Sequence, residues 1–191
     1  MFRRILVSLG CFVLLLPYGP MAEAPASGFL ELTLHLNPAD TEEFAPSYQT
    51  VAWLETPEGE YVRSLLVSEY MSYGGFMDPD LCPNWHKVSN WEVNYEEEMD
   101  AVTAATPGLD ETVLTFDCEK EKLTPGVYKY LVQTHIVENY NILYSGEIRI
   151  GGDENESVAE VTFSPSEYPG ANRVLAGVKA RYYRTSGRVN E

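Results

Sequence analysis

Leucine at every second position is the feature that most constrains this chain. Leu30, Leu32, Leu34 and Leu36 alternate with polar or charged residues, and a period of two indicates a strand with one buried face. Further runs rich in Val, Ile, Tyr and Trp follow, separated by Pro and Gly turns and almost without helical periodicity. The pattern predicts an all-β sandwich. The other expected strands lie at residues 50–54, 61–67, 113–116, 127–136, 142–150, 158–163 and 173–183.

One segment, about residues 70–107, interrupts this strand pattern. It carries several turn signals together with Trp85 and Trp91. Residues 84–91 predict one or two helical turns, because apolar side chains there share a face. A long excursion between the strands of a compact domain is usually functional or an insertion. The two Trp side chains are expected either to pack the excursion onto the sandwich or to stack on a cofactor ring.

The N-terminus has the pattern of a targeting segment. Arg3 and Arg4 precede the apolar run Ile5–Leu16, which has 12 residues and is too short to span a bilayer comfortably. Small residues follow, with cleavage expected after Ala26, so residues 1–26 predict a secretory signal peptide. An uncleaved anchor helix is the alternative. The expected protein is therefore secreted or periplasmic, without stable membrane insertion.

Composition and charge bound the partners and the domain organisation. The chain has 29 acidic residues against 13 Lys and Arg, a net charge of -16. An acidic chain of this size repels phosphate backbones, which argues against nucleic acid as a partner. Its length favours a single domain, expected over residues 27–183, with a flexible tail at 184–191.

Two cysteines, Cys82 and Cys118, follow the expected signal peptide. In an oxidising compartment two cysteines predict one disulfide, with two free thiols as the alternative. A metal site is a weaker hypothesis. His86, His135 and acids such as Glu138 have the ligand types for copper or iron, but the histidines lack metal-binding spacing. No metal site is predicted.

The segment Asp100–Thr106 carries the most specific chemistry. It reads Asp-Ala-Val-Thr-Ala-Ala-Thr and resembles the acceptor motif of extracytoplasmic flavoproteins, Asp-x-x-Ser/Thr-Gly-Ala-Ser/Thr. In those proteins a flavin transferase moves FMN from FAD onto the last hydroxyl. The resemblance implies that Asp100 is the recognition acid, Thr103 the middle hydroxyl, Ala105 the small residue and Thr106 the FMN acceptor.

Two observations bear on this assignment. Ala104 stands where the motif usually has Gly, and a Cβ there disfavours a backbone conformation with positive φ. Pro107 and Gly108 follow the expected acceptor, and this is ordinary turn chemistry. A surface turn is therefore the alternative for Thr106.

A wider resemblance covers about residues 29–150. The chain resembles a bacterial periplasmic family known as domain of unknown function 2271. This resemblance implies an immunoglobulin-like sandwich related to the flagellar hook-cap fold, and a context of membrane redox and iron-acquisition components. Cys118 stands where the family usually has Gly. The matching residues are Val51–Glu55, Gly59–Leu65, Trp85, Trp91, Asp100–Pro107, Leu114–Asp117, Leu123–Tyr128 and His135.

The expected fold is thus an immunoglobulin-like β-sandwich with one irregular, short-helical insertion. The expected function is that of a redox-accessory protein, not itself an enzyme. It would carry covalent FMN on Thr106 and exchange electrons with a membrane redox protein, after loading by a flavin transferase. The alternative is a cofactor-free binding or structural module, which would hold its partner through the region from Trp85 to Trp91.

Overall fold

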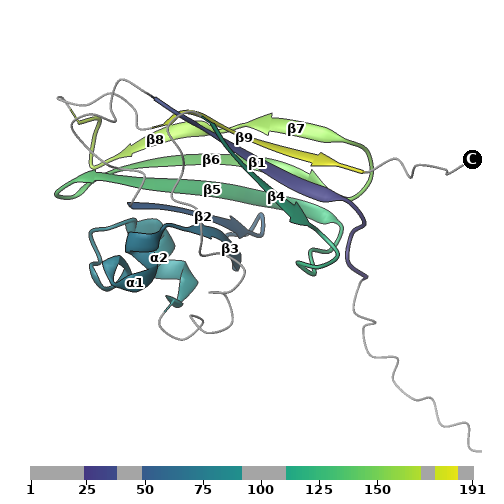
Figure 1. Ribbon diagram of the computed structural model, residues 1–191, viewed down its shortest axis with the longest axis horizontal. Helices are drawn as coiled ribbons and strands as arrows, with labels where there is room; N and C mark the ends of the chain where they lie inside the picture. Colours follow the sequence, from purple (N-terminus) through teal and green to yellow (C-terminus); the bar gives the residue numbers. More distant parts are fainter. Residues whose placement is uncertain (1–23, 38–48, 92–110, 169–174, 185–191) are drawn as a thin grey trace, which may run out of the picture.

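The computed structural model describes residues 24–37, 49–91, 111–168 and 175–184 of the chain. Within these ranges nine strands and three short helical segments are present (Figure 1). In chain order they are β1 Phe29–Leu36, β2 Thr50–Glu55, β3 Tyr61–Val67, α1 Glu69–Tyr73, the 3-10 helix η3 Gly75–Met77, α2 Pro83–Ser89, β4 Glu111–Asp117, β5 Gly126–Val137, β6 Tyr140–Ile150, β7 Asn155–Val158, β8 Glu160–Ser164 and β9 Leu175–Tyr183.

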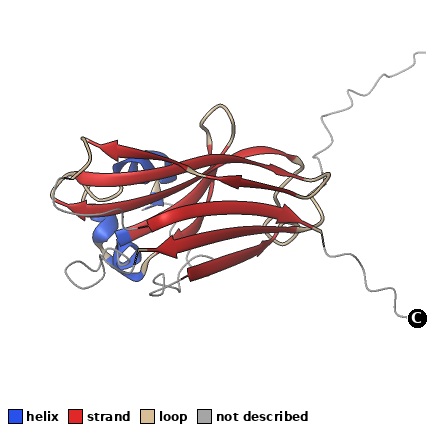
Figure 2. Cartoon of the chain, turned by 90° about the horizontal axis from the view of Figure 1, so that it is seen from above, coloured by secondary structure: helices blue, strands red, loops and turns tan. Residues whose placement is uncertain are grey.

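The strands form two antiparallel sheets that pack face to face. One sheet has the order β4-β1-β9-β7 and the other the order β3-β2-β5-β6-β8. This arrangement confirms the predicted all-β sandwich. The helices of the described residues follow β3 and lie against the five-stranded sheet, on the side away from the four-stranded one (Figures 1 and 2).

The first strand shows how the sequence pattern positions the core. Leu30, Leu32 and Leu34 are buried between the sheets, whereas Glu31 and Thr33 alternate with them on the outer face. The pleat of a strand sends successive side chains to opposite faces, so the period of two becomes one apolar and one polar surface. The predicted half-buried strand is therefore confirmed.

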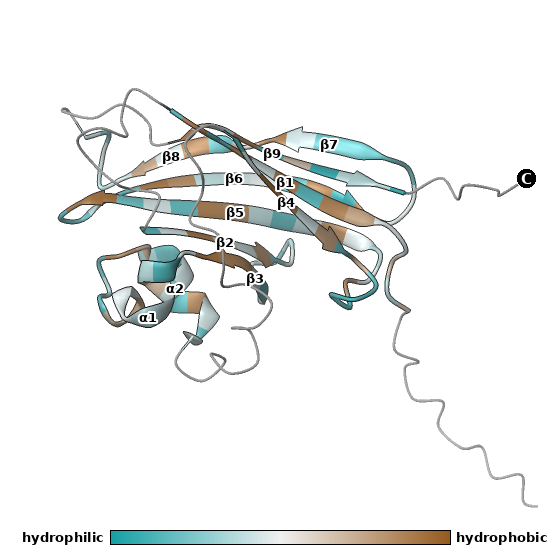
Figure 3. Ribbon diagram, in the orientation of Figure 1, coloured by the Kyte–Doolittle hydropathy of each residue, from teal (hydrophilic) through white to brown (hydrophobic). Residues whose placement is uncertain are grey.

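Strand β2 is buried on both faces, which makes the five-stranded sheet a middle layer. Ala52 and Leu54 point into the core between the two sheets. Val51 and Trp53 point the other way, into a second apolar cluster shared with the helices. A strand covered on both sides needs apolar residues at consecutive positions, and the hydropathy colouring shows such bands on β2 and β3 (Figure 3).

One predicted strand is divided between the sheets. The sequence pattern predicts a single strand at 158–163, but β7 pairs with β9 and β8 pairs with β6. Only Ala159 separates them, and its N–H donates to the Val178 carbonyl at 2.9 Å. The alternation of side chains does not reveal which partner each half of a strand chooses, so the sequence could not locate this switch.

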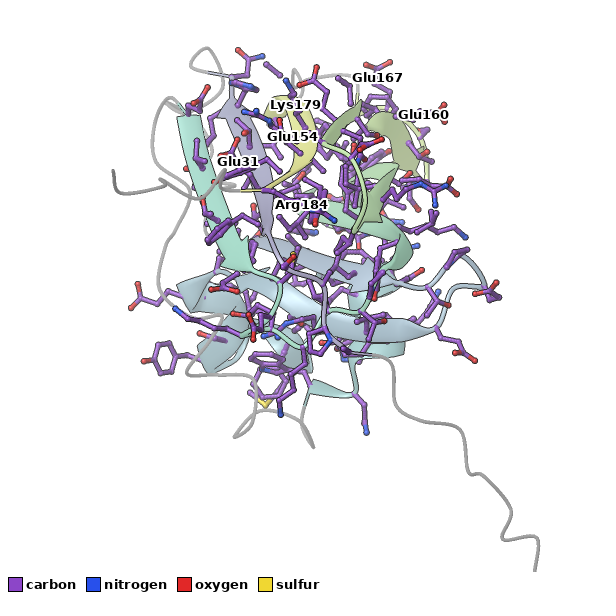
Figure 4. The ribbon with its side chains drawn as sticks, turned by 90° about the vertical axis from the view of Figure 1, so that its right-hand side faces the viewer. Glu31, Glu154, Glu160, Glu167, Lys179 and Arg184 are labelled. Atoms are coloured by element: carbon purple, nitrogen blue, oxygen red, sulfur yellow. The ribbon has the colours of Figure 1, made fainter. Side chains whose placement is uncertain are left out.

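The outer face of the four-stranded sheet carries charges of both signs. Lys179 pairs with Glu156 at 2.6 Å and Arg181 with Glu154 at 3.4 Å. The Lys179 ammonium holds the pKa of the Glu156 carboxyl below its ordinary value. Lys179 and Glu154 lie near Glu31 in the side-chain view (Figure 4). This face is a solvated surface whose basic residues have partners on the same sheet.

Candidate ligand-binding site on the helical layer

The helical layer, residues 69–91, is fastened to the five-stranded sheet by two buried amides. Gln133 on β5 accepts the N–H of Asn84 at 3.0 Å and that of Trp85 at 3.4 Å. Asn141 on β6 accepts the Cys82 N–H at 3.1 Å. The first N–H groups of a helix have no partner within it. Here the sheet supplies the acceptors, because Cys82 at the N-cap position makes no side-chain cap.

The tryptophans pack the layer onto the sheet. Trp85 and Trp91 are buried, with ring centroids 5.3 Å apart. The Trp85 Nε1–H donates to Ser64 Oγ on β3 at 3.0 Å, and Trp53 lies in the same cluster. Of the two alternatives for the pair, packing is therefore confirmed. Trp85 is fully buried, and Trp91 is 3% exposed at the edge of a small hollow.

The expected disulfide between Cys82 and Cys118 is absent, which corrects that prediction. Both cysteines are free and buried. Cys82 belongs to the cluster under the helices, and Cys118 belongs to the core between the sheets. The five-stranded sheet separates these clusters, and the bond requires Cα atoms within about 7 Å. Burial raises the pKa of both thiols, that of Cys118 to about 11.

His135 is a buried imidazole in the same region. It lies on β5 opposite Asn141 on β6, and its Nδ1 has no hydrogen-bond partner among the described residues. Burial lowers the pKa of the imidazole, and the nearby Asn141, Asp78 and Asp80 oppose that effect. Within the described ranges no three His, Cys, Asp or Glu side chains gather as metal ligands would.

The expected flavin-acceptor residues lie outside the described residues. Asp100, Thr103, Ala105 and Thr106 all fall within residues 92–110, between Trp91 and β4. Their roles stay predictions from the sequence, as does the effect of Ala104.

A pocket opens on the exposed side of the helical layer. Its volume is about 480 Å³, and its described lining consists of Glu69, Tyr70, Tyr73, Gly74 and Gly75. Tyr70 is 51% exposed and Tyr73 is 69% exposed. Tyrosines three apart on a helix lie on one face, so both rings border the same hollow. Large exposed rings at a concave site are typical of binding surfaces.

Two features hold the Tyr70 ring in place. Met71, the next residue, is buried in the cluster under the helices, which sets the rotation of α1. Gly75 lies directly against the Tyr70 ring: a Cβ at position 75 would come within 2.8 Å of ring atom Cδ1 and 3.0 Å of the Tyr70 carbonyl. Glycine at 75 therefore permits the close approach that positions the ring.

Other hollows on the described surface differ in character. A smaller one of about 160 Å³ lies on the same layer beside Phe76 and His86. A polar hollow of about 410 Å³ lies on the sandwich itself and is lined in part by Lys129, Glu147 and Glu160. The tyrosine pocket is distinguished by its exposed aromatic rings.

The sequence predicted a functional role for the same excursion, but it favoured side chains other than those that line this pocket. It singled out Trp85 and Trp91, which are core residues. Tyr70 and Tyr73 carried a weaker signal, two aromatic residues three apart immediately before Gly74 and a second glycine. Such spacing on an amphipathic helix is usually a buried stripe. Here the neighbouring Met71 fills that role, and the tyrosines face outward.

The fold and this surface define a two-sheet antiparallel β protein with an added helical layer that carries an aromatic pocket. Each described helix is too short to cross a membrane. Comparison of the chain with family models, with curated proteins and with solved structures finds no match.

Proposed function

We propose that this chain is a secreted or periplasmic binding module that captures its ligand in the tyrosine pocket of the helical layer. The observation that carries the proposal is the exposure of Tyr70 and Tyr73 around one hollow on a short helix. Three of the five large apolar side chains that are exposed in the described structure, Tyr70, Tyr73 and Met77, fall in this one stretch of eight residues. Exposed apolar side chains that gather in this way mark interaction sites.

The attachment of the helical layer to the five-stranded sheet supports this function. Gln133 and Asn141 anchor the start of α2 to the sheet, and the buried Trp85 fills the space between. A site supported by a rigid sheet loses less conformational entropy on binding than a site on a free loop. The secreted or periplasmic location rests on the expected signal peptide at residues 1–26.

The test is a fragment screen by ligand-observed saturation-transfer NMR. The library contains neutral sugars, amines, aromatic acids and short peptides. Hits should lose their signal when Tyr70→Ala and Tyr73→Ala are combined, and they should keep it in the control Val158→Ala, an exposed substitution on the other sheet. Hits that persist in the double variant, or a library without hits, would contradict the proposal.

A second candidate, covalent FMN on Thr106, rests on the sequence of Asp100–Thr106. In this alternative the chain is an electron-transfer protein in a membrane redox or iron-acquisition system, and its partners are a flavin transferase and a membrane redox protein. Thr103 and Ala105 would complete the segment that the transferase grips. The flavin would perform the redox chemistry, and the protein would position it.

Intact mass spectrometry after co-expression with a flavin transferase tests this candidate. A gain of one FMN that survives denaturation and is lost in Thr106→Ala would support it. An unmodified chain would contradict it, provided that a known acceptor is modified in the same cells. Thr106→Ser is the matched control, because it keeps the nucleophilic hydroxyl.

We also propose the immunoglobulin-like class for the sandwich, together with membership of the family known as domain of unknown function 2271. The support is a pair of packed antiparallel sheets with a helical excursion after the third strand. Sandwich domains share this architecture across differing topologies. An experimental structure of a family member would support membership if β1 lay between β4 and β9, and a different strand order would oppose it.

A further inference from the structure

We infer that the tyrosine pocket recognises an organic cation, an ammonium or guanidinium group; this inference rests on the proposed binding function. The described lining combines two exposed rings, Tyr70 and Tyr73, with one carboxylate, Glu69, and two glycines. The face of an aromatic ring attracts a cation through its quadrupole, and a carboxylate adds direct charge attraction. No Lys or Arg belongs to the described lining, so no cation of the described chain occupies this position.

The sequence that flanks the pocket residues is acidic, which also favours a cationic ligand. Glu69 opens α1, and the exposed Asp78 and Asp80 lie on the loop after η3. The whole chain has a net charge of -16. A surface of this sign concentrates cations near it and repels anions. A carboxylated or phosphorylated ligand would therefore meet repulsion from Glu69, whereas a positively charged one would gain.

The chain shows the same chemistry elsewhere. The Arg181 guanidinium carbon lies 5.1 Å from the centroid of the Tyr183 ring on β9. At that position the cation comes from the chain itself. Tyr73 has a ring of the same kind, but the described lining of its pocket contains no Lys or Arg. We therefore expect the ligand to supply it.

A pair of probes that differ only in charge tests the inference. Choline and its neutral isostere 3,3-dimethyl-1-butanol have nearly the same shape, so any difference in affinity reports the charge. Binding is followed by amide chemical shifts of the labelled chain. Choline should bind at least about fivefold more tightly than the isostere, the difference expected for a cation near two exposed rings. Added salt should reduce the difference.

The variants separate the ring from the carboxylate. Tyr73→Phe keeps the π face and should keep choline binding, whereas Tyr73→Leu should lose it. Glu69→Gln should weaken choline and leave the neutral isostere unchanged. Val158→Ala should change neither. The amide spectrum of each variant shows whether the fold is intact.

The outcomes distinguish a failure of the cation inference from a failure of the proposed binding function, and they identify the source of the cation. Tighter binding of N-acetyl-arginine amide than of choline would indicate an arginine side chain of a partner protein. The reverse order would indicate a free quaternary amine. Equal binding of choline and the isostere would overturn the cation inference, although Tyr73-dependent binding of both would still support a binding module. Binding of neutral sugars through Tyr73, when neither cation binds, would likewise overturn the cation inference and still support a binding module.

Discussion

Gln133 and Asn84 exchange two hydrogen bonds across the boundary between the sheet and the helical layer. The Asn84 N–H donates to Gln133 Oε1 at 3.0 Å, and Gln133 Nε2 donates to Asn84 Oδ1 at 2.9 Å. Gln133 is buried on a central strand, 49 residues away in sequence from the helix that it caps. Helix α2 of the helical layer is thus anchored by a residue that belongs to the sandwich.

Gln133→Ala is expected to loosen the helical layer more than the sandwich. The substitution leaves the N–H groups of Asn84 and Trp85 without their acceptor, which costs about 1–3 kcal/mol. Hydrogen exchange should accelerate in residues 83–89 and little in β1. Glu147→Gln, at an exposed position of the neighbouring strand β6, should change stability by less than about 0.5 kcal/mol. Equal acceleration in both regions would contradict this role.

Thiol labelling tests the correction about the cysteines. The native chain should react with a maleimide at neither Cys82 nor Cys118, because both are buried and burial raises the pKa of each thiol. After denaturation without a reductant, both should be labelled. A denatured chain that needs a reductant before it reacts would show that the cysteines are bridged after all.

Gly146→Ala is expected to destabilise the sandwich strongly. A Cβ at this position would lie 2.3 Å from the Tyr130 hydroxyl, which crosses Gly146 to donate to the Ser157 carbonyl at 3.0 Å. Overpacking of this kind costs about 1–3 kcal/mol, measured by chemical denaturation. Gly177→Ala is the matched control, since a Cβ there meets no atom within 4 Å. An equal loss of unfolding free energy in Gly146→Ala and Gly177→Ala would contradict this prediction.

The buried His135 should make stability depend on pH. Burial lowers the pKa of its imidazole in the folded chain, so the unfolded chain binds more protons at mildly acidic pH. Its contribution is complete above the unfolded pKa of about 6.5 and is lost as the pH falls below that value towards the folded pKa. The free energy of unfolding should therefore decrease from pH 7.5 to 5 less steeply in His135→Gln. An unchanged slope would contradict this assignment.

The sequence predicted the strands well because their burial is local information. The leucine alternation of β1 and the run 61–67 match observed strands. The strand switch at Ala159 could not be predicted, because it depends on which sheet each half meets. The disulfide prediction used compartment and cysteine count, and neither records the sheet that lies between Cys82 and Cys118.

The candidate site was less predictable for a similar reason. Tryptophan and tyrosine have comparable apolar surfaces, and their exposure depends on how the excursion docks. Trp85 became core because Ser64 accepts its N–H and Gln133 holds its helix against the sheet. On α1 the buried residue is Met71, and Tyr70 and Tyr73 face solvent. Gln133, which holds α2, lies 49 residues from Asn84 in the sequence. No local pattern in the excursion reveals such a distant partner.

A map of amide chemical shifts on the labelled native chain tests the binding site most directly. Saturation with the best fragment of the screen should move the signals of residues 69–77 and leave those of β1 and β9 in place. Movement confined to the polar hollow around Lys129 and Glu160, or no movement anywhere, would contradict the account of the tyrosine pocket as the binding site.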